Sequence, residues 1–138
     1  MLIDDILSRF IGNSPRNYYS FETFILNLLK YHLESLNKPF TISDNPRMPG
    51  DAVAELGFDD IEGKTIIEIK LNLDRIPPRL FVERFIGRLH RKEIIPDFKN
   101  ILIINSHQIS ERTRDRILSE FSILTPQVKI ILWGQEEL

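Results

Sequence analysis

Residues 64–71 read Lys-Thr-Ile-Ile-Glu-Ile-Lys-Leu, and this stretch decides the fold. It is rich in β-branched residues, which predicts a β-strand. Successive side chains of a strand point to opposite faces, so Glu68 and Lys70 share one face, and Ile67 and Ile69 share the other. The strand therefore presents a carboxylate and an ammonium group on one surface and an apolar pair on the opposite surface.

A second strand is expected immediately upstream of this one. Residues 43–50, Ser-Asp-Asn-Pro-Arg-Met-Pro-Gly, are turn-forming, residues 51–58 alternate loosely, and residues 59–63 form another turn. Because the second turn is short, the strands on either side of it should pair as an antiparallel hairpin.

Asp51 is the polar side chain that this hairpin brings to the strand over residues 64–71. A turn centred near residues 60 to 62 places Asp51 beside positions 69 to 71. Asp51 shares a face with Glu68 and Lys70 only if the register has the matching parity, such as Asp51 opposite Lys70. We therefore expect Asp51 to lie next to Glu68 and Lys70.

The remaining segments predict an α/β domain. In chain order they are a short helix over 2–11, a long helix from Ser20 to Leu36 with Ser20 as its N-cap, a short edge strand over 39–42, a helix after Pro77-Pro78, a buried strand over 100–105, a helix over 110–121 and a strand over 128–133. Together with the hairpin, the order α-α-β-β-β-α-β-α-β predicts a mixed central sheet flanked by helices.

The composition limits the class of protein. The chain has 138 residues, 42% hydrophobic and 28% charged, which is ordinary for one compact soluble domain over residues 1–138. It has no cysteine, no apolar run long enough to span a membrane and no secretory signal at its start, so we expect a cytoplasmic protein without a membrane partner. The net charge of -2 argues against nucleic-acid binding by bulk charge alone, although residues 70–116 are locally basic.

Two carboxylates and a lysine at one strand end suit the hydrolysis of phosphodiester bonds. Mg²⁺ or Mn²⁺ takes oxygen ligands, and one or two carboxylates often hold the ion while waters and substrate phosphate complete its shell. Such a metal polarises the phosphate and activates a water, and a lysine stabilises charge in the transition state. Asp51 and Glu68 are therefore the candidate metal ligands, and Lys70 is the candidate catalytic cation.

These residues match a known signature. Pro49-Gly50-Asp51, followed by Glu68-Ile69-Lys70, resembles the PD-(D/E)XK motif of restriction-endonuclease-like nucleases. The likeness is to the Mrr-type branch, in which a glutamate on the preceding helix is matched by Glu22, and residues 101–106 and 131–138 look like later strands of that branch. Two departures are Glu68, where many Mrr-type members have glutamine, and Gly50, which separates Asp51 from the proline.

The resemblance implies a fold, a cofactor and a substrate. It implies an αβββαβ core and Mg²⁺-dependent cleavage of DNA, less often of RNA. Mrr-like domains are often joined to NTPase or sensor domains in defence systems, which implies an antiviral effector role and a regulatory partner of that kind.

Each candidate also has a structural interpretation. An acid-X-lysine triplet is common on half-exposed strands, and Glu22 in a first helical turn would stabilise the helix dipole. Arginines on one side of the helix after Pro78 would contact nucleic-acid phosphates, but a solvated helix face is an equally ordinary interpretation. This basic stripe consists of Arg79, Arg84, Arg88 and Arg91.

Three functions fit the motifs. The leading hypothesis is an endonuclease effector domain acting on DNA. The second is a catalytically silent scaffold of the same fold that binds nucleic acid or protein, although a silent domain has no physical need to keep repelling carboxylates together. The third is a structure-specific junction resolvase, which a homodimer with two sites facing one duplex would favour.

Overall fold

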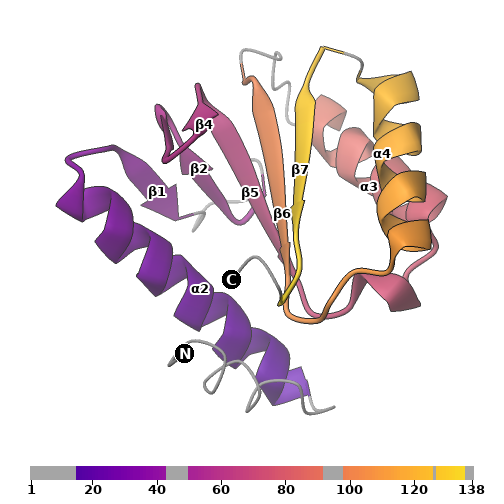
Figure 1. Ribbon diagram of the computed structural model, residues 1–138, viewed down its shortest axis with the longest axis horizontal. Coiled ribbons are helices and arrows are strands. Elements are labelled where there is room, and N and C mark those ends of the chain that lie inside the picture. The colour runs from indigo at the N-terminus through magenta and orange to yellow at the C-terminus, as the bar shows by residue number, and fades with distance from the viewer. Residues whose placement is uncertain (1–14, 43–49, 92–97, 126, 136–138) are drawn as a thin grey trace.

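The central sheet is mixed and has five strands in the order β1-β2-β5-β6-β7 (Figure 1). The computed structural model describes residues 15–42, 50–91, 98–125 and 127–135, and for residues 15–20 and 89–91 the backbone alone. The strands are β1 (Phe40–Ile42), β2 (Ala52–Ala54), β5 (Thr65–Lys70), β6 (Asn100–Asn105) and β7 (Lys129–Trp133). The contacts between β1, β2 and β5 are antiparallel, and those between β5, β6 and β7 are parallel.

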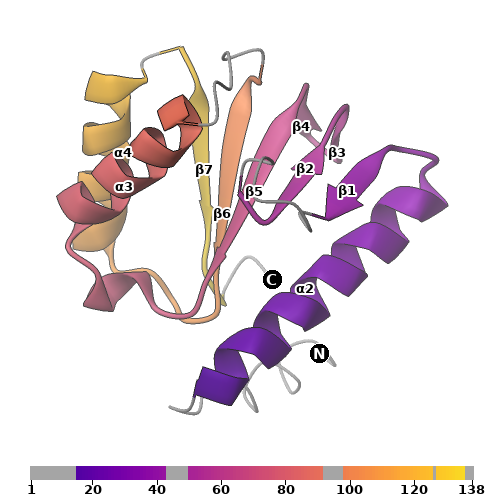
Figure 2. The ribbon, with the colours of Figure 1, turned by 180° about the vertical axis from the view of Figure 1, so that it is seen from behind.

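Helices cover both faces of this sheet (Figures 1 and 2). Helix α2 (Pro15–Ser35) lies on one face, and α3 (Pro78–Arg91) and α4 (Glu111–Leu124) lie on the other. The expected α/β class, a mixed sheet flanked by helices, is confirmed. Parallel strands that are covered on both sides should be apolar throughout, and all six residues of β6 are buried, as the sequence predicted.

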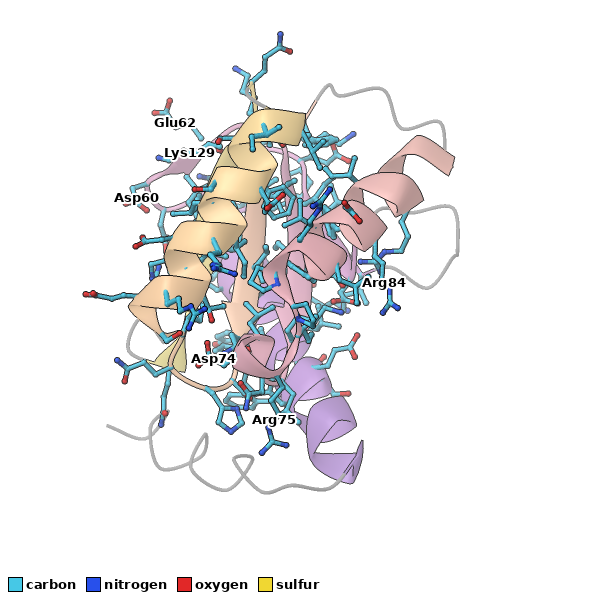
Figure 3. All side chains as sticks on the ribbon, turned by 90° about the vertical axis from the view of Figure 1, so that its right-hand side faces the viewer. Asp60, Glu62, Asp74, Arg75, Arg84 and Lys129 are labelled. Atoms are coloured by element: carbon cyan, nitrogen blue, oxygen red, sulfur yellow. The ribbon has the colours of Figure 1, made fainter. Side chains whose placement is uncertain are left out.

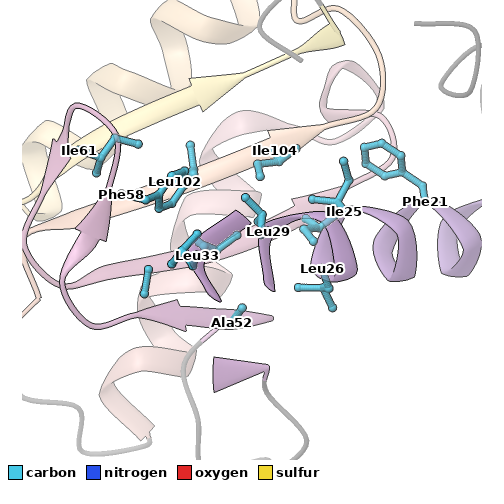
Figure 4. Close-up of a cluster of buried hydrophobic side chains, with 13 residues drawn as sticks. Phe21, Ile25, Leu26, Leu29, Leu33, Ala52, Phe58, Ile61, Leu102 and Ile104 are labelled. Carbon is cyan, nitrogen blue, oxygen red and sulfur yellow. The ribbon is translucent and has the colours of Figure 1, made fainter. Parts of the chain in front are cut away.

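Each face of the sheet has its own hydrophobic core. The core under α2 follows from helical spacing of apolar residues, and Figure 4 shows it packed against the sheet; its helical members are Phe21, Ile25, Leu26, Leu29 and Leu33. The core under α3 and α4 contains the three rings of Phe81, Phe85 and Phe121, whose centroids lie 5.9 to 6.4 Å apart. Strand β5 separates the two cores, because Ile67 and Ile69 belong to the first and Ile66 to the second.

Helix α2 begins at Pro15, so the expectation of an N-cap at Ser20 is wrong. Proline suits the first helical position because its missing N–H would have no partner there. The earlier start has a consequence for Glu22, since the first turn of α2 contains no acidic residue. The helix-dipole interpretation of Glu22 therefore fails. The expected helix over 2–11 lies outside the described residues.

The segment 51–58 forms two short strands instead of one. Strand β2 ends at Ala54, and the chain then forms a separate hairpin of β3 (Gly57–Phe58) and β4 (Ile61–Glu62). Gly57 explains the break, because its φ of +71° is rarely adopted by other residues, and an added Cβ would lie 2.1 Å from the Ile61 carbonyl oxygen. The loose alternation of the sequence did not reveal this turn.

The connections after β5 bring helix N-termini to the end of the sheet at which β5 and β6 finish. A 3-10 turn, η1 (Leu73–Arg75), leads to α3, and Ser110 caps α4 by accepting a hydrogen bond from the Thr113 N–H. The cap confirms the expected start of the helix near residue 110. No helix in the described part of the chain is long and apolar enough to cross a membrane.

Candidate active site

Strand β5 carries Glu68 and Lys70 to the face covered by α3. Glu68 lies beneath that helix with only 2% of its surface exposed, while the apolar neighbours Ile67 and Ile69 face α2. The expected separation of polar and apolar faces is thus confirmed. The Lys70 ammonium lies 3.5 Å from Glu68 Oε1, so the two charged side chains of the strand form an ion pair.

The β2–β5 ladder brings Asp51 to Glu68. Ala52 pairs with Ile67, and continuing this antiparallel register by one residue would bring Asp51 opposite Glu68. The β2–β5 register therefore has the parity that a shared site requires. It differs by two residues from the suggested pairing of Asp51 with Lys70, and Glu68 falls just outside the expected positions 69 to 71. The turn is centred one residue earlier than expected, at Asp59 and Asp60, between the paired residues of β3 and β4.

Asp51 leaves the regular ladder at this point. Its N–H donates to the Ile67 carbonyl at 2.8 Å, and its Oδ2 accepts a hydrogen bond of 2.7 Å from the Ile69 N–H. Ile69 has passed the end of β2, so this carboxylate oxygen takes the place of a missing strand acceptor. Gly50 permits the approach, because its φ is +62° and an added Cβ would lie 2.7 Å from the Ile67 carbonyl oxygen. Asp51 is thereby fixed at the rim of the sheet.

Glu68 has two cationic neighbours on one oxygen and none on the other. Its Oε1 lies 3.5 Å from the Lys70 Nζ and 3.4 Å from a guanidinium nitrogen of Arg88. Its Oε2 is buried and has no hydrogen-bond partner in the described structure. A buried carboxylate oxygen normally has a donor, so this atom marks an unsatisfied acceptor inside the site.

Aromatic rings of α3 hold both cations in place. The Lys70 Nζ lies 5.7 Å from the centre of the Phe81 ring, and the Arg88 guanidinium carbon lies 5.3 Å from the centre of the Phe85 ring. Cations at such distances are attracted to the ring faces. The helix thus orients the positive charges toward Glu68.

Glu22 reaches the site from the opposite helix. The Glu22 side chain interacts with the Asp51 carboxyl group, so a residue of α2 influences the pKa of Asp51. Burial raises the pKa of Asp51 from 3.8 to about 6, and the negative charge of Glu22 adds to the rise, against the lowering effects of the Ile69 N–H and Lys70. The structure therefore brings together all four residues expected at the site, Glu22, Asp51, Glu68 and Lys70.

The two buried carboxylates repel each other. Burial raises the pKa of Glu68, and the negative charge of Asp51 raises it further, while Arg88 and Lys70 lower it. Two carboxylates that disfavour each other's ionisation favour binding of a proton or a cation between them. The electrostatics of the site thus favour an additional positive charge.

Asp51 and Glu68 supply the oxygen ligands that a hard divalent cation prefers. The described residues contain no group of three or more His, Cys, Asp or Glu side chains that could hold a metal ion. A Mg²⁺ or Mn²⁺ ion held by two carboxylates would take its other ligands from water and substrate phosphate. The unsatisfied Glu68 Oε2 fits such a ligand set.

Arg88 is the residue whose place the sequence interpretation missed. The sequence interpretation assigned Arg88 to a phosphate-contacting or solvated face of the helix, but its guanidinium lies over the Phe85 ring and pairs with Glu68. The signal was present, because Arg88 follows Phe81 by seven residues, nearly two helical turns, and so lies on the same face. Of the other stripe residues, Arg79 pairs with Glu83 at 2.9 Å and Arg84 points outward (Figure 3), while the side chain of Arg91 lies outside the described part.

A comparison with models of protein families, with curated proteins and with solved structures finds no match to this chain. The interpretation of the site therefore rests on its residues and their geometry. Asp51, Glu68 and Lys70 converge from two neighbouring strands, as a PD-(D/E)XK site would require, with Glu22 and Arg88 completing the cluster from the flanking helices.

Proposed function

We propose that this chain is a metal-dependent endonuclease that hydrolyses phosphodiester bonds of DNA. The observation that carries the proposal is a pair of mutually repelling, largely buried carboxylates, Asp51 and Glu68, beside a lysine on the same strand. A purely structural domain gains nothing from burying such a pair, whereas a divalent cation would neutralise it. A role as an effector in a defence system is the setting that the resemblance implies.

The architecture supports the same proposal. The described elements follow one another in the αβββαβ order of the restriction-endonuclease-like core. In chain order they are α2, β1, β2, β5, α3 and β6, with the β3–β4 hairpin inserted before β5. The positions of the candidate residues support the same core, because Asp51 lies just before β2, and Glu68 and Lys70 lie on β5, with which β2 pairs.

Each residue of the site would have its own role in the reaction. Asp51 and Glu68 would hold Mg²⁺ or Mn²⁺, which polarises a phosphate and activates a water when it is bound. Lys70, oriented by Phe81, would stabilise the negative charge that develops on the phosphate. In the reaction a water oxygen forms a bond to phosphorus, one P–O ester bond breaks, and the departing oxygen takes up a proton. Glu22 would keep Asp51 in position.

A cleavage assay tests the proposal. The purified chain is incubated with plasmid, linear duplex, single-stranded DNA and RNA, in Mg²⁺, in Mn²⁺ and in EDTA. Asp51→Asn, Glu68→Gln and Lys70→Met should each lower the cleavage rate by about 100-fold or more. The matched controls are Asp60→Asn and Glu62→Gln, which remove the same groups from exposed positions on the β3–β4 hairpin (Figure 3) and should keep the rate within about twofold.

Two results would overturn the nuclease proposal. One is the lack of metal-dependent cleavage of every substrate. The other is cleavage that persists unchanged in the three site variants, because this would come from a contaminant. Cleavage of RNA without cleavage of DNA would correct the substrate and keep the mechanism.

A further inference from the structure

A second polar hollow lies at the N-terminal ends of α3 and α4. It has a volume of about 410 Å³ and is bordered by η1, by Pro78 at the start of α3 and by Ser110 at the start of α4. Figure 3 shows Asp74 and Arg75 at this end of the molecule, far from Asp60, Glu62 and Lys129 at the opposite end. None of the residues at the candidate active site lines this pocket.

Three arginines line the pocket, and none of them has a carboxylate partner among the described residues. Arg75 extends from η1, and Arg112 and Arg116 lie one turn apart on α4, so the two side chains are neighbours on that helix. No salt bridge joins any of the three to another described residue, in contrast to Arg79 with Glu83. Three guanidinium groups close together repel one another, and a shared anion would remove that repulsion.

Asp74 is the acidic residue of the lining, and its hydrogen-bond partners Ser110 and Thr113 also line the pocket. Its Oδ1 accepts hydrogen bonds from the hydroxyl of Ser110 at 2.9 Å and from the Ser110 N–H at 3.4 Å. Hydrogen bonds from Thr113 and Ser110 lower the pKa of Asp74, so this carboxylate is ionised and stabilises the start of α4. Three arginines against one ionised carboxylate leave the lining with a net positive charge.

We propose that this pocket binds a phosphate group, carried either by a nucleic-acid strand or by a free nucleotide. Guanidinium groups match phosphate in geometry and bind it through paired hydrogen bonds. The volume is within the range of small-ligand sites.

The position of the pocket favours a strand as the source of the phosphate. Pro78 lines the pocket, and Phe81, less than one turn further along α3, contacts the Lys70 ammonium. A strand whose scissile phosphate lay at Lys70 would thus continue toward the three arginines. The choice of a strand rests on the proposed nuclease function, whereas phosphate binding by the pocket does not.

The test is a titration of the metal-free protein followed by ¹H–¹⁵N NMR at constant ionic strength. The probes are inorganic phosphate, adenosine 5′-monophosphate and a single-stranded DNA octamer. Amide signals of Arg75, Arg79 and residues 110–113 should move with each probe that binds. The variant Arg112→Gln/Arg116→Gln should bind about tenfold or more weakly, since each lost paired contact removes a charge-assisted hydrogen bond.

A matched double variant controls for net charge. Lys30→Gln/Lys129→Gln removes the same charge from exposed positions on α2 and β7 and should keep the affinity within about twofold. Tighter binding of the octamer than of the nucleotide, lost in the arginine variant, identifies a strand as the source. Binding of the nucleotide or phosphate alone identifies a free phosphate ligand. No signal change at the pocket, or an equal loss in the lysine control, would overturn the proposal.

The two proposals fail independently. Asp51→Asn should bind the probes at this pocket as the wild type does, because Asp51 does not line it. A protein that binds phosphate here but never cleaves nucleic acid would refute the nuclease proposal alone.

Discussion

Glu68 carries an energetic cost that its neighbours only partly offset. Lys70 and Arg88 both approach Oε1, and Oε2 remains buried without a donor in the described structure. An unsatisfied buried polar atom costs about 1–3 kcal/mol, and more when it carries charge. Proteins keep an unfavourable buried charge mainly where the chemistry of a functional site requires it. The burial of Glu68 is therefore stronger support for a functional site than the acid-X-lysine triplet itself.

Asp51 should make the stability of the metal-free protein depend on pH. Its pKa is raised in the folded state, from 3.8 to about 6, so the folded protein binds this proton more tightly than the unfolded chain. The resulting stabilisation is fully present below about pH 4 and is lost as the pH rises through about 6. Relative to Asp51→Asn, the wild type should lose on the order of 2–3 kcal/mol between these pH values.

Urea unfolding of both proteins between pH 4 and pH 7, in buffer treated to remove divalent metals, measures this difference. Asp60→Asn serves as the control, because Asp60 is exposed and its removal should leave the pH dependence of the wild type intact. Parallel stability curves for the wild type and Asp51→Asn would refute the argument.

The positions of the site residues could be predicted from the sequence to different degrees. Glu68 and Lys70 follow from strand parity alone, and Asp51 follows once a hairpin is assumed. The hydrogen bond between Asp51 and Glu22 joins elements that are not paired in the sheet, so only the resemblance pointed to Glu22. Arg88 was misplaced because charged residues are usually assigned to the solvent face of a helix, whereas its long side chain reaches from the apolar face to a buried carboxylate.

At the scale of elements, the β3–β4 hairpin sets the register on which the site depends. It lies between β2 and β5, and its turn at Asp59 and Asp60 fixes which residue of β5 meets Asp51. Asp59 adopts a positive φ of 51° and its carboxylate contacts the His32 ring at 2.9 Å, which ties the hairpin to α2. A one-residue slip would turn Asp51 to the other face of the sheet.

Gly57→Ala should therefore destabilise the protein more than an ordinary surface substitution. The added Cβ would lie 2.1 Å from the Ile61 carbonyl oxygen and 2.9 Å from the Gly63 carbonyl oxygen, at a φ of +71°. We expect a loss of about 2 kcal/mol or more in the free energy of unfolding, from steric overlap and left-handed backbone strain.

Gly87→Ala is the matched control, because this residue lies within α3 and an added Cβ would have no atom within 4 Å. It should stabilise the protein by about 0.5–1 kcal/mol, since glycine is unfavourable inside a helix. Chemical unfolding of both variants provides the comparison. Equal effects of the two substitutions would mean that the hairpin does not depend on the backbone freedom of Gly57.

Most elements could be predicted, and the exceptions have local causes. Strand β6 and helix α4 agree with the sequence interpretation because a continuous apolar run and a serine cap are strong signals. The break in 51–58 was missed because a tight turn at one glycine leaves the alternation of the flanking residues almost unchanged. The start of α2 was missed because Ser20 is a good cap, but the earlier Pro15 is already compatible with the helix.

At the scale of the whole molecule, the stability of the fold and the proposed function are linked. Two apolar cores hold the sheet from both sides, and the polar cluster of Asp51, Glu68, Lys70 and Glu22 lies where β2 begins and both helical layers approach the sheet. The packing of the folded chain thus holds these repelling groups together. A ligand that neutralises them should remove part of the repulsion and so increase the stability of the folded protein.

Metal binding should therefore raise the melting temperature of the wild type. At a free Mn²⁺ concentration about a hundred times the dissociation constant, binding stabilises the folded state by roughly 2.7 kcal/mol, which corresponds to an increase of roughly 8–12 °C for a domain of this size. Asp51→Asn and Glu68→Gln remove a ligand each and should lose most of the increase, although both should be at least as stable as the wild type without metal.

Lys70→Met separates ligand binding from catalysis. It removes a cation 3.5 Å from Glu68 but no metal ligand, so it should keep or enlarge the metal-induced increase in melting temperature while losing cleavage. Glu62→Gln, at an exposed carboxylate, should respond to Mn²⁺ as the wild type does. Because substrate phosphate can complete a two-carboxylate site, the melts are repeated with Ca²⁺ and a short DNA duplex. If the melting temperature of the wild type does not change with Mg²⁺, Mn²⁺ or Ca²⁺, with and without DNA, then Asp51 and Glu68 do not form a divalent-metal site.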